Sequence, residues 1–356
     1  MSAVAAFVDL EALTQAAPEW RELCARACEA NPFAEPAFLL PLIAYENPRV
    51  RYVLVRENGR LIGFATLRLP LVGLARVWMS AYAALPACAF DAERVGVALR
   101  ALLKLLVDRT RLSGLVFGFV ERDGPLAAAL RAAGPVVVAS ETRRTSLRLA
   151  GAAAFAASLN PKRAAKWKRQ LRKLTSQGRF EIGSGREEIE AFFAVEPRGW
   201  KGARGTALSN DPARLAFARA ALGAFADFGR LDAMTLRLDG EPIAAGLVLR
   251  AGTRAFYWKT AYDEAYADAS PGVQLTLAHS RRLAGTPGLM LVDSCAGEDH
   301  PMIGRVWGDE LLFEDLALAL RSERALTIWL ALGRLKAAAR AELKRAINRG
   351  LERKSV

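Results

Sequence analysis

Histidine, cysteine and long apolar runs are scarce in this sequence. Among 356 residues there are only two histidines and four cysteines, and their spacing matches no zinc site. Cys24 and Cys28 lie one helical turn apart, which favours buried thiols on a helix face. We therefore expect no bound metal and no disulfide.

The sequence also lacks a segment that suits a membrane span or a signal peptide. Its longest charge-free stretch, residues 77–90, falls short of the roughly 20 apolar residues that a span needs, and it contains Pro86. Residues 1–10 have no basic region and already include Asp9. With 52% hydrophobic and 24% charged residues the composition is that of a globular protein. Without a span or a signal peptide we expect it to be cytoplasmic, and its length of 356 residues predicts two domains.

Positive charge is concentrated in two segments of the chain, whose formal net charge is +13. Residues 162–173 contain seven basic and no acidic residues, and residues 321–356 contain ten basic and three acidic ones. This concentration indicates an anionic partner at these two places. For residues 162–173 the alternatives are phosphates of a carrier, RNA or lipid, or a plain solvated face. The single Trp167 does not favour specific nucleic-acid binding.

Residues 1–150 predict helices followed by strands. Apolar spacing indicates helices at 10–28 and 33–45, and Asn58-Gly59 indicates a tight hairpin turn. The other expected elements are strands at 51–57, 61–69, 75–82, 115–120, 136–140 and 145–149, a helix at 92–110 and a short helix after Pro125.

Residues 179–320 repeat this order. Gly59 of the first hairpin turn and Gly240 of a second turn, Asp239-Gly240, are 181 positions apart, and Trp78 and Trp258 are 180 apart. We therefore predict two copies of an αα-βββ-α-β unit. The elements expected in the second copy are helices at 186–196, 212–228 and 271–283, strands at 233–238, 243–250, 254–261 and 289–294, and a β-like run at 311–313.

Two basic amphipathic helices accompany the copies. Residues 151–178 connect the copies, and Asn160-Pro161 and Gly178 bound a helix with one apolar face. Residues 321–356 form a second helix, which has the form of a membrane-surface anchor or of an oligomer contact. Its apolar stripe consists of Ile328, Leu332, Leu335, Ala339, Leu343 and Ile347.

Polar chemistry is densest between residues 196 and 291. Three glycines (Gly199, Gly202 and Gly205) allow positive φ or a close approach of the backbone to a ligand. The side chains around them are a carboxylate (Glu196), an indole (Trp200), an amine (Lys201) and a hydroxyl (Thr206), a combination that is typical of a pocket rim. With Ser270 as cap and Pro271 in the first turn, a helix would point the amides of Gly272 and Val273 outward, which suits phosphate. An ordinary capped helix is the alternative.

These residues resemble a known family. The element order resembles the GNAT acyltransferase fold, and two copies joined by a basic helix resemble the Fem-type transferases. The likeness is strongest to the CelD or BioF2-like acetyltransferase domain. Typical features of that domain are a basic helix, a loop with Glu and Gly-Trp-Lys-Gly, a Tyr-Asp pair after a strand, a Ser-Pro-Gly helix start and an Asp at the end of the next strand. Here they correspond to residues 162–173, Glu196 with Gly199 to Gly202 and Gly205-Thr206, Tyr262-Asp263, Ser270-Pro271-Gly272 and Asp293.

The resemblance implies a fold and an activity. The fold would be of the α/β (α+β) class, with tandem GNAT domains at 1–150 and 179–320, each a mixed, mostly antiparallel sheet flanked by helices. The activity would be that of an N-acyltransferase, which moves an acyl group from acyl-CoA, such as acetyl-CoA, to an amine. The acceptor would be a small amine or sugar-like molecule, such as an envelope or polysaccharide precursor.

Acyl transfer from a thioester to an amine needs a bound donor, a neutral amine and an acid for the leaving thiolate. Glu196 is the predicted base, unless it is simply paired with Arg198 or Lys201. Tyr262 is the predicted acid, although its counterpart Tyr82 equally favours a packing role. The predicted catalytic residues are Glu196, Tyr262, Asp293 and His300; Trp200, Lys201, Thr206, Lys259 and Asp263 are predicted to bind substrate, and Ser270, Pro271, Gly272 and Val273 the donor.

Two of these groups have other interpretations. Lys259 either faces an anionic group or pairs with Asp263, and His300 is a base, a substrate contact or a loop residue without a role. Two other functions also stay open. One is Fem-like transfer from aminoacyl-tRNA, and the other is a non-catalytic module that binds an anionic polymer or a membrane.

Overall fold

The structure is a computed structural model that describes residues 3–298, 300 and 302–352. Its first half begins with a strand, two short helices and a longer helix, and then forms most of a sheet. The elements are β1 (Val4–Val8), α1 (Leu10–Gln15), α2 (Ala17–Ala25), α3 (Pro36–Glu46), β2 (Arg51–Glu57), β3 (Arg60–Arg68), β4 (Leu74–Val77), β5 (Cys88–Phe90), α4 (Val95–Arg109), β6 (Gly114–Glu121), α5 (Pro125–Ala133) and β7 (Val136–Arg148).

The second half follows a connection of two helices and repeats the order of the first. The connecting helices are α6 (Ala152–Ser158) and α7 (Pro161–Thr175). The elements that follow are β8 (Phe180–Ser184), α8 (Glu188–Val195), α9 (Trp200–Ala203), α10 (Pro212–Asp227), β9 (Leu231–Leu238), β10 (Glu241–Ala251), β11 (Arg254–Tyr262), α11 (Pro271–Ala284), β12 (Leu291–Asp293), α12 (Ile303–Val306), β13 (Asp309–Ala319) and α13 (Glu323–Glu352). The predicted duplication of an αα-βββ-α-β unit is therefore confirmed.

The strands of both halves join one mixed sheet. In the described part of the chain it has 13 strands, in the order β1-β2-β3-β4-β6-β13-β7-β12-β11-β10-β9-β8, with β5 on β3. Neighbours are antiparallel except β4 with β6 and β11 with β12, which are parallel. Each half thus has the predicted mixed, mostly antiparallel sheet. The two sheets are continuous, which the sequence did not predict.

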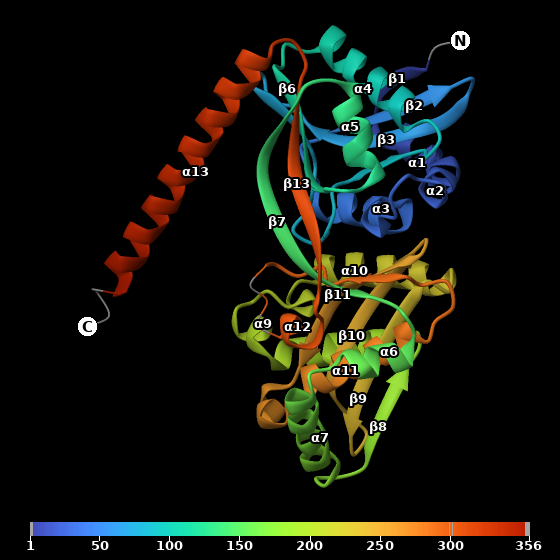
Figure 1. The fold of residues 1–356 in the computed structure, drawn as a ribbon, viewed down its shortest axis with the longest axis vertical. Coiled ribbons are helices and arrows are strands. Elements are labelled where there is room, and N and C mark those ends of the chain that lie inside the picture. Colours follow the sequence, from blue (N-terminus) through green and yellow to red (C-terminus); the bar gives the residue numbers. More distant parts are fainter. Residues whose placement is uncertain (1–2, 299, 301, 353–356) are drawn as a thin grey trace.

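Continuity comes from an exchange of the last strands. β13 of the second half lies between β6 and β7, and β7 of the first half lies between β13 and β12. Figure 1 shows both strands running from the upper, first half into the lower, second half. Each half therefore uses the last strand of the other to complete its own sheet.

A shared core fills the junction beside these strands. Helices α3 and α10 pack against each other, and Phe38 of α3 lies with its ring centroid 5.5 Å from Phe217 and 5.4 Å from Trp258. These rings are almost completely buried. Burial of large aromatic side chains contributes strongly to stability, so this core helps to hold the two halves together.

Several predicted boundaries are wrong. The helix expected at 10–28 is broken at Ala16, because Pro18 lies in the first turn of α2 and has no amide to continue the preceding helix. The two strands expected at 136–140 and 145–149 are one strand, β7. The short run expected at 311–313 extends over all of β13, because its polar residues pair with β6 and β7.

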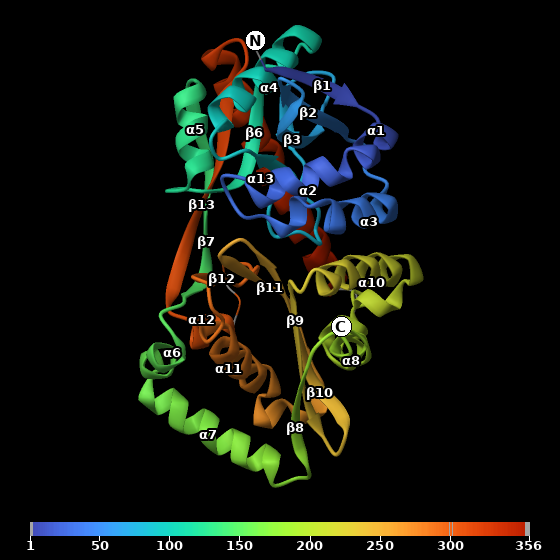
Figure 2. The ribbon, with the colours of Figure 1, turned by 90° about the vertical axis from the view of Figure 1, so that its right-hand side faces the viewer.

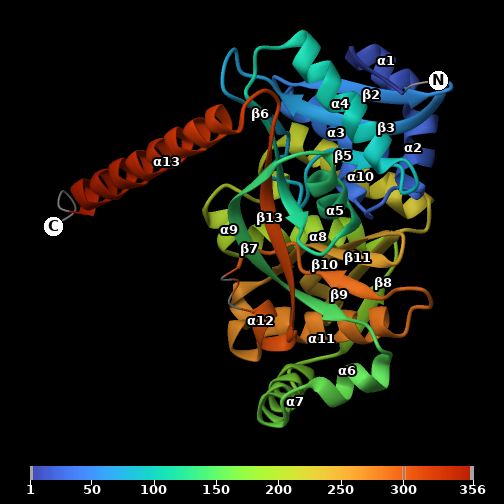
Figure 3. The same cartoon turned by 45° about the horizontal axis from the view of Figure 1, so that its top comes forward.

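Helix α13 packs only its first turns on the body. Leu326 and Leu330 are buried, whereas Ile328, Leu332 and Leu335 of the predicted apolar stripe are 40–67% exposed. Figures 1 and 3 show the rest of α13 projecting away from both halves. The side chains of Leu343 and Ile347 lie outside the described residues, and contact of the stripe with a membrane or a second copy stays a prediction. Among the described residues, none of the helices has the length and apolar character needed to span a bilayer.

Candidate active site

Glu196 is held inside the second half by the loop that follows it. The residue ends α8 and begins a 3-10 turn, and only 1% of its surface is exposed. Its Oε2 accepts a hydrogen bond of 2.7 Å from the amide of Leu208. A buried carboxylate needs such partners, and this bond also closes the loop between residues 196 and 208.

The glycines of this loop allow it to fold tightly. A Cβ atom at Gly199 would lie 3.0 Å from the carbonyl oxygen of Tyr262, and one at Gly202 would lie 1.8 Å from the carbonyl oxygen of Pro197. Gly205 has a φ of +69°. Side chains are thus excluded where the loop approaches itself and the end of β11.

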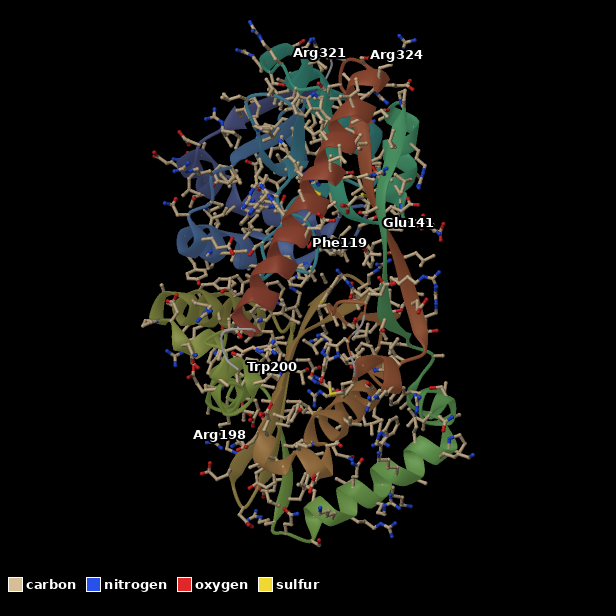
Figure 4. All side chains as sticks on the ribbon, turned by 90° about the vertical axis from the view of Figure 1, so that its left-hand side faces the viewer. Phe119, Glu141, Arg198, Trp200, Arg321 and Arg324 are labelled. Carbon is tan, nitrogen blue, oxygen red and sulfur yellow. The ribbon has the colours of Figure 1, made fainter. Side chains whose placement is uncertain are left out.

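A small pocket of about 30 Å³ lies between this loop and β11. Trp200 forms part of its exposed rim, where the Arg204 guanidinium stacks 5.1 Å from the centre of the indole ring. Figure 4 shows where Trp200 lies in the second half. Thr260 and Ala261 also line the pocket, and the sequence analysis did not single them out. The lining residues are Glu196, Gly199, Trp200, Thr260, Ala261 and Tyr262.

Tyr262 connects this pocket with the start of α11. It is the last residue of β11, and a Cβ atom at Gly272 would lie 3.1 Å from its Cδ1 atom and 3.1 Å from the sulfur of Met302. The predicted base, the predicted acid and the predicted donor-binding helix start therefore lie side by side. Sequence spacing alone did not bring these three segments together.

The helix start differs in detail from the prediction. Ser270 adopts a left-handed conformation (φ 51°) and makes no side-chain cap, and the amide of Val273 donates to the carbonyl oxygen of Ser270 at 3.0 Å. The prediction of a Ser270 cap with an outward Val273 amide is thus wrong, because the left-handed turn directs the hydroxyl elsewhere. The Gly272 amide has no acceptor among the described residues.

The basic helix α7 lies against this helix start. Gln170 donates from Nε2 to the Ser270 hydroxyl at 2.9 Å, and Lys173 pairs with Asp268 at 3.6 Å. Lys166 precedes Gln170 by one turn and lies on the same face of α7. Figure 2 shows α7 beside α11 at the end of the second half that is remote from the first. The sequence analysis found this charge but did not connect it with residues 270–273.

Asp293 lies in the junction between the halves. Its Oδ2 accepts a 2.9 Å bond from the Nη1 of Arg144 in β7, and its Oδ1 accepts a 2.7 Å bond from the amide of Cys295. Both members of this ion pair are buried, and Arg144 also donates to the carbonyl oxygen of Ala84. The contacts give Asp293 a structural use, and its predicted part in catalysis stays a prediction.

His300 lies beside the far side of the helix start. Its Nδ1 accepts long hydrogen bonds of 3.4 Å from the amides of Met302 and Ile303, at the start of α12. The sulfur of Met302 in turn lies close to Gly272, 3.1 Å from where a Cβ atom would stand. His300 is exposed, and the two bonds of its Nδ1 hold the start of α12, so its predicted part in catalysis stays a prediction.

The remaining predicted residues lie around the rim. The ammonium of Lys259 lies over the rings of Tyr82 (5.8 Å) and Trp258 (5.2 Å). Asp263 accepts from the amide of Ala265 at 2.9 Å and lies 3.8 Å from Arg198. Thr206 is exposed, and the side chain of Lys201 lies outside the described part of the chain.

Comparison with known proteins gives the class of protein that this fold and site define. The family model for the acetyltransferase (GNAT) domain matches residues 161–300, which extend from α7 to His300. The predicted resemblance is confirmed over this part of the chain, which matches the GNAT acetyltransferase domain. No curated protein matches the sequence closely enough to count as a relative.

Solved structures extend the likeness to both halves. FemX has a TM-score of 0.57 at 14% identity, over 90% of this chain and 98% of its own. A conserved protein of unknown function from Bacteroides thetaiotaomicron VPI-5482 has a TM-score of 0.56 at 11% identity, over 88% of this chain and 99% of its own. The C-terminal domain (DUF2156) of a putative lysylphosphatidylglycerol synthetase from Agrobacterium fabrum has a TM-score of 0.54 at 11% identity, over 89% and 95%. At such identities these structures share the fold alone.

Proposed function

We propose that the protein is an N-acyltransferase that moves an acyl group from acyl-CoA to an amine at the site in its second half. The GNAT domain match over residues 161–300 supports acyl transfer. The observation that carries the proposal is the position of Tyr262, which lines the pocket with Glu196 and lies so close to Gly272 of α11 that a Cβ atom there would be 3.1 Å from its ring. It makes the proposed acid, the proposed base and the proposed donor-binding segment contiguous.

The proposed reaction needs one proton acceptor and one proton donor. The amine nitrogen attacks the thioester carbonyl carbon, a C–N bond forms, and the C–S bond breaks. Glu196 accepts the proton that the nitrogen loses, and Tyr262 donates its phenolic proton to the departing sulfur. A water molecule then carries the proton from Glu196 back to Tyr262, so the products are an amide and free thiol.

The residues at the start of α11 fit the phosphates of the donor. The open amide of Gly272 lies at a helix N-terminus, where the helix dipole favours negative charge. Helix α7, which bonds to Ser270 through Gln170, adds positive charge through Lys166 and through Lys173, the partner of Asp268. We propose these three groups as the phosphate contacts.

A second candidate is transfer of an amino acid from aminoacyl-tRNA. All seven cations of α7 are exposed, so this helix presents a positive face long enough for a polyanion. The acceptor in either case is proposed to be a small amine or a sugar-like envelope precursor.

The test combines donor binding with turnover. Thermal unfolding is measured with acetyl, medium-chain and long-chain acyl-CoA, since a ligand of the folded state raises the midpoint. Thiol release is then measured with a panel of amines for wild type, Glu196→Gln and the control Glu190→Gln, an exposed carboxylate on α8 paired with Arg219. We expect Glu196→Gln to lower kcat/KM by about 100-fold or more, with donor binding and Glu190→Gln unchanged.

Two results would contradict the proposal. One is a melting midpoint that no thioester shifts while aminoacyl-tRNA supports product formation, which selects the second candidate. The other is full turnover by Glu196→Gln, which would remove this carboxylate from the chemistry.

A further inference from the structure

The first half contains a pocket that the proposed reaction does not use. Its volume is about 240 Å³, and it lies where β4 and β6 diverge. Figure 4 labels Phe119, one of its lining residues. Those that matter here are Arg68, Arg76, Trp78, Met79, Phe119 and Asp315.

Two arginines in this pocket lie directly opposite each other. Arg68 of β3 pairs in register with Arg76 of β4, so both side chains lie on the same face of the sheet. Both are exposed, and neither makes an ion pair or hydrogen bond with another described residue. Like charges directly opposite on a sheet are destabilising, so this pair costs stability unless an anion lies between them.

The fold itself does not require these arginines. The repeat offsets of 181 and 180 place Arg68 and Arg76 on Leu249 and Phe256 of the second half, and these two residues are also opposite each other, in β10 and β11. There the pair is apolar and buried, at 0% and 1% exposure. The first half thus has two cations where its copy packs a hydrophobic core.

A third cation and an apolar wall complete the pocket. Arg49 lines an adjoining open hollow of about 640 Å³ that shares Arg68 and Arg76. Two carboxylates also line these spaces: Asp315 accepts the amide of Phe119 at 3.0 Å, and Glu46 accepts the hydroxyl of Ser80 at 2.7 Å. Trp78, Met79 and Phe119 supply a largely apolar surface beside the charges.

We propose that this pocket binds a ligand with a phosphate group on a small apolar or aromatic body. A single arginine satisfies both oxygens of a carboxylate with its fork of donors, whereas two or three converging arginines suit the oxygens and double charge of a phosphate monoester. The apolar wall contacts the organic part. The inference is independent of the acyl-CoA site, because it rests on different residues.

Calorimetric titration with phenyl phosphate, inorganic phosphate and benzoate tests this inference. We expect phenyl phosphate to bind more tightly than either other probe. Arg68→Gln and Arg76→Gln are each expected to weaken it by about tenfold or more, since a hydrogen bond to a charged group is lost. Arg100→Gln, which removes an exposed arginine from α4 of the same half, is the matched control and leaves binding unchanged.

Stability without ligand separates binding from a structural role. At low salt, Arg76→Gln is expected to raise the melting temperature by on the order of 1 °C, because it relieves the repulsion. A lower melting temperature, equal affinity of wild type and both variants, or benzoate binding as tightly as phenyl phosphate would each overturn the inference. These measurements use no thioester, so their result does not depend on whether the protein is an acyltransferase.

Discussion

In the first half α4 begins behind two acidic residues, whereas in the second half α11 begins behind Ser270 and Pro271. Asp91 before α4 is buried and paired with Arg26 at 2.7 Å and Arg60 at 2.8 Å. Burial alone would raise the pKa of this carboxyl, but the bonds from Arg26 and the Glu93 amide and the charges of both guanidinium groups outweigh it and lower the pKa. The corresponding start of α11 has an open amide at Gly272. A buried carboxylate with two arginines thus precedes the helix of the first copy, whereas Ser270 and Pro271 stand directly before Gly272 in the second.

The tyrosines at matched positions differ in the same way. Tyr82 lies in the junction, where its hydroxyl is 3.4 Å from that of Tyr45 and its carbonyl oxygen accepts the indole of Trp258 at 2.7 Å. The hydrogen bond between the two hydroxyls raises the pKa of Tyr45 to about 12. Tyr262 instead lines the pocket beside Glu196. Under the proposed function, the duplicated fold thus uses one tyrosine for assembly and the other for chemistry.

The largest expected effect tests whether the halves depend on each other. Arg144→Ala leaves Asp293 buried without its partner, which typically costs about 3–5 kcal/mol. Urea unfolding measures this loss against Arg143→Ala, a neighbour whose ion pair with Glu310 is exposed. We expect the control to change stability little. Equal effects of the two variants would show that the buried pair does not join the halves.

A second comparison uses the two tyrosines. Tyr262→Phe is expected to lower kcat by about 100-fold with an unchanged melting temperature, because it removes the proton donor. Tyr82→Phe is expected to cost about 1 kcal/mol of stability and to leave kcat unchanged. Steady-state kinetics and thermal unfolding of both variants decide the matter, and equal kinetic effects would remove the distinction between the copies.

Each half also has a carboxylate that accepts a hydrogen bond from the backbone amide of a later segment, and in the second half this is Glu196 with Leu208. In the first half this is Glu29, bonded to the amide of Leu126 at 3.1 Å, and burial raises its pKa from 4.5 to about 7. Between pH 4.5 and about pH 7 the folded state keeps a proton on Glu29 that the unfolded state has lost, so the free energy of unfolding falls as the pH rises through this window.

The variant Glu29→Gln is expected to lack this fall in stability. Above about pH 7 it should exceed wild type by on the order of 2 kcal/mol, measured by urea unfolding from pH 5 to 8. Activity stays unchanged, in contrast to Glu196→Gln. Parallel pH profiles of wild type and variant would mean that Glu29 does not titrate in this range.

The smallest effect concerns the second residue of each helix, Gly96 in α4 and Gly272 in α11. A Cβ at Gly96 would lie 3.5 Å from the Arg100 guanidinium, an ordinary contact, so Gly96→Ala is expected to stabilise by a few tenths of a kcal/mol. Gly272→Ala is expected to raise the KM for acyl-CoA several-fold, since the methyl group crowds Tyr262 at 3.1 Å. Donor titrations that do not distinguish the two variants would argue against a donor site at α11.

Local patterns predicted much of this molecule. Asn58-Gly59 and Asp239-Gly240 both form the expected hairpin turns, with positive φ at all four residues. The helix expected from Pro161 is α7. The repeat offsets predicted the duplication, since matched turns and tryptophans persist after the rest of the two copies has diverged.

The exchange of strands was beyond local patterns. Residues such as Glu141 and Arg144 interrupt the apolar alternation of β7, so two strands were expected in place of one. Their backbone pairs with β13, far away in sequence, and Arg144 finds its carboxylate in β12. Likewise the contact of Tyr262 with Gly272 depends on how β11 and α11 pack, which no spacing encodes.

The exchanged strands also determine the order in which the nascent protein is completed. Phe119 of β6 and Asp315 of β13 are 196 positions apart in the chain. At ribosomal rates of about 5–20 residues per second, β6 waits roughly 10–40 seconds for its partner. Throughout this interval its open edge is available to chaperones and to other nascent chains. The half that leaves the ribosome first is therefore the last to be sealed.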